Sequence, residues 1–596
     1  MTRSRTFLIS AGAAIANSFI YGFVYGAENH EFDLPLLNWL RNPALYPNDP
    51  LKDSFTHFPT VFWILVSHLS HYMDQKNVIL LFFAITKLLF FTALGRIVDR
   101  VIRDWKATAV ILFCIAVSPF LNDYTPLAAS DILNSVQTQT SLAIALLLWS
   151  AVFLIEDRIE IATIIAAITI YFEALFVLYT AFPIGFFALR QIRKRPLRVV
   201  IAGVSGLVVA LPYLIYFRMY DPPPFPPNFV HALLNFYPFH LNLQSHAPYE
   251  LISGFGLIAA AFWMIRVTKK AGTARYQELE WLLISYSIPL VLGALFGFKF
   301  LTPNLARAQL LRSDTFVLLY SILILQVYGL QLARSTNSIH YFLVGLTALL
   351  VAVTDYLGLL WFLYILFALN ENTLESVYQS IRRSTTSRIV LVSVLLLALS
   401  AAGLAYKSWS STIVVLCVVL ASSVFNVSQF RQATMLIASA LAILMCAVGI
   451  SPDTCSFWCL DVPPTPLERD WHDVQIWAKD NTPVAARFLV PTFPGGFRTF
   501  SERTSYGEWK DGTAIYLIPS FSDEYLRRMR EVGIDTSNHW IELKQMMKNY
   551  DRLPWEQLLK VAQTNKLDYI VQFRDARYPD HAIYSNSRYA VYKVRP

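Results

Sequence analysis

The sequence carries little charge for its length. Only 15% of its 596 residues are Asp, Glu, Lys or Arg, whereas 55% are hydrophobic and the mean hydropathy is +0.45. Because soluble globular chains carry about 25% charged residues, this composition excludes that class and favours a polytopic membrane protein. The net charge of +8 does not indicate nucleic-acid binding, since the basic residues stand in short clusters between apolar runs.

Cysteine is scarce, and the common cofactor motifs are missing. Of the five cysteines, Cys114, Cys417 and Cys446 stand inside apolar runs and are expected to pack as small core residues. Cys455 and Cys459 follow the last run, and the sequence leaves open whether they form a disulfide or stay free thiols. No phosphate-binding loop, dinucleotide fingerprint, nucleophile elbow or zinc-ligand spacing occurs.

What the sequence has instead is a series of apolar runs that can cross a membrane as helices. Two runs, 161–189 and 338–370, are too long for one span, and each is predicted to be a hairpin of two short helices. Glu173 stands near the turn of the first hairpin and Asp355 in the middle of the second. Counting both as hairpins gives 15 spans, within a predicted range of about 13–15. The runs are 7–26, 77–95, 107–121, 137–155, 161–189, 198–217, 251–265, 281–297, 314–333, 338–370, 389–405, 411–427 and 433–450.

Basic residues alternate between the loops in a way that predicts the orientation. Cytoplasmic loops are rich in Lys and Arg, so the N-terminus, MTRSR before a run interpreted as a retained signal anchor, is predicted to be cytoplasmic. An odd number of spans then places the C-terminal segment outside the cytoplasm. The predicted cytoplasmic clusters are Arg96, Arg100, Arg103 and Lys106; Arg190, Arg193, Lys194, Arg195 and Arg198; Arg266, Lys269, Lys270 and Arg275; and Arg382, Arg383 and Arg388.

From about residue 451 the composition changes to a charged, Trp- and Tyr-rich pattern. Strands are predicted at 486–493, 567–573 and 588–594, and helices at 522–533 and 553–565. The predicted fold is therefore mainly α: a transmembrane helical bundle over 1–450 with a C-terminal extracytoplasmic α/β domain over 451–596.

Four ionisable residues stand within six positions where the first apolar run ends: Glu28, His30, Glu31 and Asp33. Acids at a membrane exit are costly unless they face water or a site. A carboxylate there can take a proton from an incoming hydroxyl, and His30 can orient Glu28 or bind a phosphate. The alternative interpretation is a solvated loop.

Acids also occur in the next loop predicted on the same side, at Asp123 and Asp131. They can join the first loop in one site or hold a divalent cation such as Mg²⁺ or Mn²⁺. Alternatively, Asp131 caps a helix over the apolar residues 132–136. The sequence does not decide between these two interpretations.

Arg307 and Arg312 precede the run at 314–333 on a side that otherwise has few cations. The planar guanidinium fork suits a phosphate; the alternative is anchoring at the membrane interface. In the C-terminal segment, Arg498, Arg503 and Lys510 are candidates to bind an anionic donor or a glycan. The alternative for these three is a solvated loop with ordinary ion pairs.

This layout resembles the GT-C superfamily of polytopic glycosyltransferases. The resemblance rests on Glu28-x-His30 directly after the first run, followed by Leu34-Pro35 and Asn42-Pro43-x-x-Tyr46-Pro47; on the acidic second loop with Asp123 and Asp131; and on the C-terminal motif Trp477-x-x-x-Asn481-Thr482-Pro483. The layout covers almost the whole chain, and the motifs cover less than a tenth of it. The chain looks most like bacterial members of this superfamily.

The resemblance implies a polyprenyl-phosphate-linked sugar donor, a glycan, lipid or protein acceptor, and a position among the lipids of the bacterial cytoplasmic membrane. It implies that Glu28 acts as base or positions the acceptor, and that Arg312 contacts the lipid phosphate. Many members carry two adjacent acids or Asp-x-Asp, whereas the third position here is His30. The resemblance therefore leaves the need for a divalent cation undecided.

The leading hypothesis is a membrane glycosyltransferase with Glu28, His30 and Asp123 as catalytic candidates. The substrate-binding candidates are Glu31, Asp131, Arg307, Arg312, Arg498, Arg503 and Lys510. One alternative is a non-catalytic scaffold or a glycan- or lipid-binding component of an envelope complex. The other is a transporter, based on Glu173 and Asp355 within apolar runs, although no internal repeat supports it.

Overall fold

The structure is a computed structural model of the chain. It describes residues 3–335 except 48, 59, 220–223 and 274–275; the short pieces 344–345, 347–349 and 351; and residues 466–594 except 538–541, 576 and 579–580. The predicted spans at 389–405, 411–427 and 433–450 and most of the run at 338–370 lie outside the described residues. So do Asp355, Cys417, Cys446, Cys455 and Cys459.

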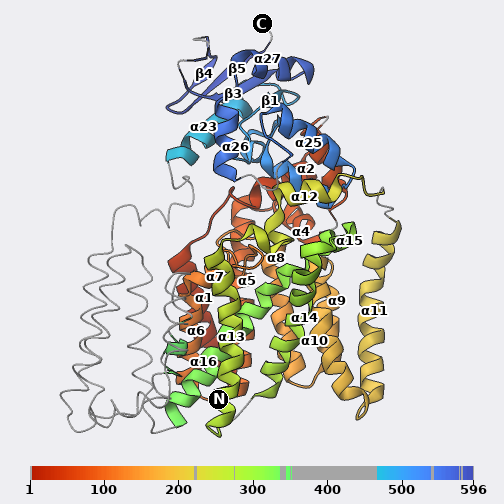
Figure 1. The fold of residues 1–596 in the computed structure, drawn as a ribbon, viewed down its shortest axis with the longest axis vertical. Helices are drawn as coiled ribbons and strands as arrows, with labels where there is room; N and C mark the ends of the chain where they lie inside the picture. Colours follow the sequence, from red (N-terminus) through yellow and green to blue (C-terminus); the bar gives the residue numbers. More distant parts are fainter. Residues whose placement is uncertain are drawn as a thin grey trace, which may run out of the picture.

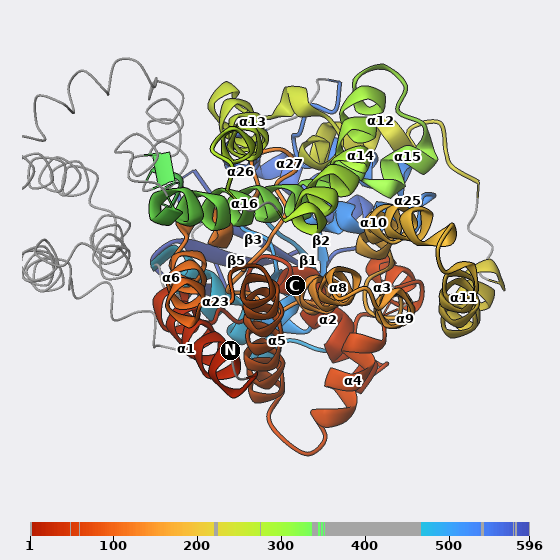
Figure 2. The same cartoon turned by 90° about the horizontal axis from the view of Figure 1, so that it is seen from below.

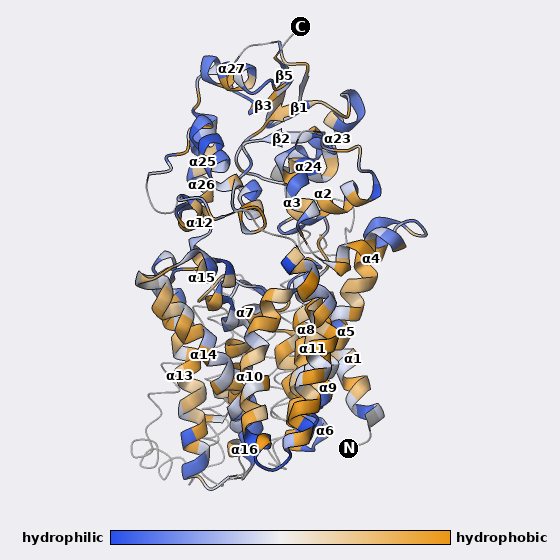
Figure 3. Cartoon of the chain, turned by 90° about the vertical axis from the view of Figure 1, so that its right-hand side faces the viewer, coloured by the Kyte–Doolittle hydropathy of each residue, from blue (hydrophilic) through white to orange (hydrophobic). Residues whose placement is uncertain are grey.

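Long helices stand side by side in a bundle, and a smaller domain lies on one end of it (Figure 1). The chain begins at the far end of the bundle and finishes in the small domain. The long helices are hydrophobic along most of their length, whereas the small domain mixes hydrophilic and hydrophobic stretches (Figure 3). The bundle helices are α1 (Arg3–Tyr21), α5 (Gln75–Ile102), α6 (Trp105–Ala116), α8 (Gln139–Ile155), α9 (Ile159–Thr169), α10 (Ala174–Ile192), α11 (Pro196–Met219), α13 (Pro248–Lys270), α14 (Gln277–Lys299) and α16 (Asp314–Ser335).

Six segments of the described chain are long and apolar enough to cross a membrane: Gln75–Ile102, Ala174–Ile192, Pro196–Met219, Pro248–Lys270, Gln277–Gly297 and Pro303–Leu332. They indicate a multi-pass membrane protein. The apolar helices α6, α8 and α9 are shorter. Every run predicted before residue 335 coincides with a helix, and the mainly helical fold is confirmed.

The run at 161–189 is indeed divided into two helices. Helix α9 ends at Thr169 and α10 begins at Ala174. Glu173 is the N-cap of α10, and its side chain accepts a hydrogen bond from the Leu175 amide at 3.2 Å. Such a cap satisfies an amide that the first helical turn leaves without a partner.

The C-terminal domain holds a mixed five-stranded sheet in the order β2-β1-β3-β5-β4. Strand β1 is parallel to β2 and β3, while β5 is antiparallel to β3 and β4. The predicted strands correspond to β1, β3 and β5 and the predicted helices to α25 and α27, whereas the very short β2 and β4 were not predicted. The elements are α23 (Pro466–Asn481), β1 (Arg487–Leu489), α24 (Phe497–Ser501), β2 (Thr504–Tyr506), the 3₁₀ helix η5 (Trp509–Tyr516), α25 (Phe521–Glu531), α26 (Leu543–Asp551), α27 (Trp555–Thr564), β3 (Tyr569–Phe573), β4 (Tyr584–Ser585) and β5 (Tyr589–Lys593).

Short helices fill the level between the bundle and the C-terminal domain (Figures 1 and 2). One hydrophobic core runs through this level, with Tyr46 and Phe55 from the first loop, Phe236 from α12, and Tyr525 and Ile570 from the C-terminal domain. The domain is therefore seated on the bundle by apolar packing. The short elements are α2 (His30–Arg41), α3 (Pro50–Thr56), α4 (Val61–Leu69), α7 (Pro119–Asn122), α12 (Phe229–Phe236), η1 (Pro238–His240), η2 (Leu243–Ser245), α15 (Pro303–Ala308) and η3 (Leu310–Ser313).

Candidate functional site

A cavity of about 1640 Å³ lies at this junction. It exceeds the roughly 300–1,000 Å³ typical of sites for one small ligand, so it has room for more than one small ligand. Its walls come from the first loop, the second loop, the α9–α10 turn, the end of α11, the α15–η3 segment and the C-terminal domain. The last contributes residues of α23, the turn at 493–496, Phe500 and η5.

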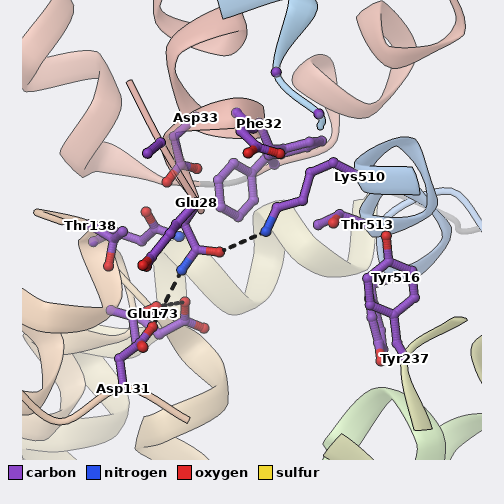
Figure 4. Close-up of a pocket in the computed structure, with 18 of the residues that line it drawn as sticks. Glu28, Phe32, Asp33, Asp131, Thr138, Glu173, Tyr237, Lys510, Thr513 and Tyr516 are labelled. Carbon is purple, nitrogen blue, oxygen red and sulfur yellow. Dashed lines mark hydrogen bonds between the residues drawn. The ribbon is translucent and has the colours of Figure 1, made fainter. Parts of the chain in front are cut away.

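Glu28 projects from the loop between α1 and α2 into this cavity (Figure 4). Its backbone is left-handed, with φ at 55°, a conformation that non-glycine residues adopt only where the surroundings hold it. The Asn134 side-chain amide donates to Glu28 Oε2 at 3.0 Å. Glu28 is exposed toward the cavity, in contrast to the partly buried Glu31 and the buried Asp33 on the same loop.

Carboxylates from three separate segments surround Glu28: Glu31 and Asp33 on α2, Asp131 on the second loop, and Glu173 at the α9–α10 turn (Figure 4). The Asn29 amide donates to Asp131 Oδ2 at 3.4 Å. Burial raises the pKa of Glu31 to about 7 and that of Asp131 to about 6. The Glu28 charge raises both pKa values further, because like charges disfavour each other's ionised form.

Asp131 does not cap a helix. Residues 132–136 form none, and Val136 instead bridges Val24. This bridge ties the second loop to the end of the first apolar segment. The alternative interpretation of Asp131 as a cap is therefore wrong, and its side chain lines the cavity.

Four cationic side chains line the same cavity: Lys76, and the three considered next, Arg307, Arg312 and Lys510. Arg312 Nε donates to Ser130 Oγ and its Nη1 to Gln309 Oε1, each at 3.2 Å. Lys510 Nζ donates to Asn29 Oδ1 at 3.1 Å (Figure 4). These contacts are to neutral groups. Because none of the three forms an ion pair within the described ranges, their charge is available to an anionic ligand.

Two glycines bring the C-terminal domain against Glu31. A Cβ on Gly495 would lie 2.4 Å from Glu31 Oε2, and one on Gly496 would lie 2.8 Å from Glu31 Cγ. A side chain at either position would displace the carboxylate. The turn Pro494-Gly495-Gly496 is thus a wall of the site. The sequence predicts a turn here, but it does not reveal that the turn lies against Glu31.

Four of the predicted site residues are not brought to the cavity wall. Asp123 is exposed beside it. His30 is buried, with Nδ1 accepting from the Gly26 amide at 3.1 Å and Nε2 lying 2.9 Å from the Gln137 carbonyl oxygen. Burial lowers the pKa of His30 to about 4, so the ring is neutral and Nε2 is the donor. His30 therefore fixes the loop that carries Glu28.

Arg498 and Arg503 are also buried away from the cavity. Arg498 pairs with Asp49, Glu508 and Asp511. Arg503 donates to the backbone carbonyl oxygens of Lys479 and Thr482 at 2.6 and 2.7 Å. Neither is placed to contact a substrate, and the burial of both also excludes the alternative of a solvated loop.

Several lining residues were not among the predicted site residues. Asp33 belongs to the acidic run but has no role in the sequence-based hypothesis, and Glu173 enters it only as a turn residue and as a basis for the transporter alternative. An acid in an apolar run is itself a signal for a polar cavity. Tyr237, His472, Phe500 and Tyr516 also line the cavity, and nothing in their local sequence distinguishes them from core aromatics.

The described residues contain no group of three or more His, Cys, Asp or Glu side chains arranged to hold a metal ion. The carboxylates that line the cavity therefore do not form a ready ligand set for the Mg²⁺ or Mn²⁺ considered from the sequence.

Comparison with known proteins gives limited matches. A family model described as a domain of unknown function, DUF6798, matches residues 469–532, which include most of α23 and the 493–510 segment of the site. No curated protein matches the sequence. Among solved structures, the chain is similar to the Archaeoglobus fulgidus oligosaccharyltransferase crystallised with Zn and sulfate, with 14% identity and a TM-score of 0.37 over 95% of this chain and 68% of that one.

Proposed function

We propose that the protein is a membrane glycosyltransferase that moves a sugar from a polyprenyl-phosphate-linked donor to an acceptor at the outer face of the bacterial cytoplasmic membrane. The observation that carries the proposal is the cavity between the membrane bundle and the C-terminal domain, which Glu28, Arg312 and Lys510 all line. A proton acceptor and cations without ion pairs are the groups that transfer from a sugar phosphate needs.

The cations suit the phosphate of the donor. Arg307 lies on α15 and Arg312 in η3, five residues apart, and both line the cavity. The neutral partners of Arg312, Ser130 and Gln309, hold its guanidinium in place without cancelling its charge. A fixed cation stabilises the negative charge that develops on the departing phosphate.

The lipid part of the donor has an apolar approach to the same cations. Leu178 on α10 and Tyr216 and Phe217 on α11 line the cavity, and their exposed fractions are 43%, 49% and 43%. Both helices are candidate membrane spans. Exposed apolar side chains at a membrane segment face lipid, so a polyprenyl chain can remain in the bilayer while its phosphate reaches Arg307.

The chemical step uses Glu28 as the base. The acceptor hydroxyl oxygen forms a bond to the anomeric carbon of the donor sugar, and the bond from that carbon to the phosphate oxygen breaks. Glu28 takes the hydroxyl proton, and the lipid phosphate leaves with the bonding electron pair beside Arg312. Attack from the side opposite the phosphate inverts the anomeric centre.

The distribution of charge along the bundle supports the outer face. The turns α5–α6 and α10–α11 carry basic residues such as Arg103, Lys106, Arg193 and Lys194, and α13 ends in Lys269 and Lys270. These lie at the end of the bundle away from the C-terminal domain (Figure 1). The positive-inside rule favours a cytoplasmic position for that end, and this supports the proposal that the cavity opens on the outer side.

The test is turnover of a polyprenyl-phosphate sugar by the purified full chain with the variant Glu28→Gln. We expect a loss of at least 100-fold, the size of general-base effects, since Gln cannot take the proton. Asp53→Asn is the matched control, because Asp53 is an exposed acid on α3 that does not line the cavity. Unchanged turnover in Glu28→Gln contradicts the proposal; donor binding without any turnover in the wild type favours the scaffold alternative.

A further inference from the structure

One wall of the cavity has no part in the reaction just described. It is formed by Tyr25, which follows α1; Trp471, His472 and Gln475 on α23; and Phe500 on α24. Helices α1 and α23 lie on one side of the molecule, whereas α11, with the apolar approach, lies at the opposite edge (Figures 1 and 2). The cavity thus has two walls that can serve two substrates.

Three rings make up the surface of this wall. The Phe500 ring lies 4.7 Å from the His472 ring at 73° and 6.2 Å from the Tyr25 ring at 57°, measured between centroids. All three side chains are only partly buried. The wall therefore presents aromatic edges and faces to the cavity, a surface suited to a ring with apolar C–H groups.

Backbone contacts fix these rings beside the acidic loop. A Cβ on Gly26 would lie 2.2 Å from Phe500 Cζ, so the missing side chain lets the ring approach the loop two residues before Glu28. The Phe500 amide donates to Gln475 Oε1 at 3.2 Å. Trp471 Nε1 donates to the Gly495 carbonyl oxygen at 2.8 Å, which joins α23 to the turn over Glu31. The wall is thus positioned relative to both acids.

His472 supplies a polar group without a partner. Its ring makes no hydrogen bond to any described residue, and burial lowers the pKa of His472. The neutral imidazole offers one donor and one acceptor, the complement of a hydroxyl group. The five side chains of this wall carry no charge at neutral pH.

We infer that this wall is the acceptor subsite and that it binds the neutral sugar ring at the end of a glycan, stacked on Phe500 and Tyr25 with a hydroxyl hydrogen-bonded to His472. The inference rests on the proposed function, because it makes the bound sugar the source of the hydroxyl that Glu28 deprotonates. The sugar is carried either by a free oligosaccharide or by a glycolipid, since both present the same ring.

The test is binding of the purified full chain to a panel of neutral oligosaccharides, oligosaccharides with a carboxylate or phosphate, and short peptides. We expect binding to neutral members. Phe500→Ala should weaken it about tenfold and His472→Gln about three- to tenfold, the size of one lost stacking or hydrogen-bonding contact. Phe500→Leu, which keeps an apolar side chain, separates loss of the ring from misfolding. Ile476→Ala, on the exposed face of α23, should bind as the wild type does.

Binding confined to anionic members or peptides overturns the inference, as does neutral-glycan binding that Phe500→Ala and His472→Gln leave unaltered, or the absence of neutral-glycan binding. Tighter binding of the same glycan on a lipid tether identifies a glycolipid, and equal binding identifies a free chain; both support the subsite. Glu28→Gln should retain glycan binding. If Glu28→Gln also retains turnover, the proposed function is wrong and the inferred subsite is not. If Glu28→Gln abolishes turnover but the wall variants keep the wild-type acceptor KM, the inferred subsite is wrong and the proposed function is not.

Discussion

Arg498 of the C-terminal domain forms a two-pronged ion pair with Asp49 of the first loop. Nε donates to Asp49 Oδ2 at 2.7 Å and Nη2 to Oδ1 at 3.2 Å, across 449 positions of sequence. Glu508 and Asp511 contact the same guanidinium at 3.2 and 2.6 Å. All four side chains are at most 2% exposed. One guanidinium thus contacts three buried acids, one from the first loop and two from the C-terminal domain.

Replacing Arg498 by Met should loosen this junction. Without the guanidinium the buried carboxylates lose their compensating charge, and removal of one partner from a buried ion pair costs about 3–5 kcal/mol. We expect a lower thermal midpoint and faster proteolysis between the bundle and the C-terminal domain. Arg577→Met is the control, since Arg577 pairs with Asp575 at the surface and such pairs contribute about 1 kcal/mol or less. Equal midpoints for Arg498→Met and the wild type would contradict this role.

Glu31 should make stability depend on pH in an unusual direction. Burial raises its pKa from 4.5 to about 7, so between these values the folded chain holds a proton that the unfolded chain has released. Stability from this group is therefore full below pH 4.5 and falls as the pH rises to 7. At 1.36 kcal/mol per unit the change is at most about 3 kcal/mol.

The measurement is the thermal midpoint of the full chain from pH 4.5 to 8, with Glu31→Gln beside the wild type. The variant cannot ionise at this position, so its midpoint should fall less over this range. Glu556→Gln, at an exposed position on α27, should keep the wild-type dependence. A Glu31→Gln curve parallel to that of the wild type would show that Glu31 ionises normally in the folded chain.

Arg312 should contribute to the affinity for the donor as well as to the rate of transfer from bound donor, because its charge contacts the donor phosphate before and during departure. A hydrogen bond to a charged group contributes about 1.5–3 kcal/mol, so Arg312→Gln should raise the donor KM roughly ten- to a hundredfold. Arg312→Lys should be intermediate, because Lys keeps the charge without the planar fork. Arg193→Gln, at the α10–α11 turn, is the matched control. An unaltered donor KM in Arg312→Gln would remove this arginine from the phosphate site.

The sequence predicts the elements better than it predicts their burial. Runs of apolar residues show where helices form, including the break at Glu173, because that signal is local. The sequence correctly predicts that Glu28 and Lys510 belong to the site. His30, two positions after Glu28, and Arg498, on the same segment as Lys510, have the same polar character but are buried. Partners far away in the sequence, Gln137 for His30 and Asp49 for Arg498, decide which member of a polar cluster faces the cavity. No local sequence pattern reveals such partners.

The bond between Asp49 and Arg498 also sets an order of events during synthesis. A ribosome that adds about 5–20 residues per second needs roughly 20–90 s to pass from the first of these residues to the second. Throughout that interval the acidic loop exists without its guanidinium, and Asp49 has no counter-charge to enter the interior. The loop therefore must remain hydrated while the rest of the chain is inserted, and the cavity closes only when the last quarter of the protein has been made.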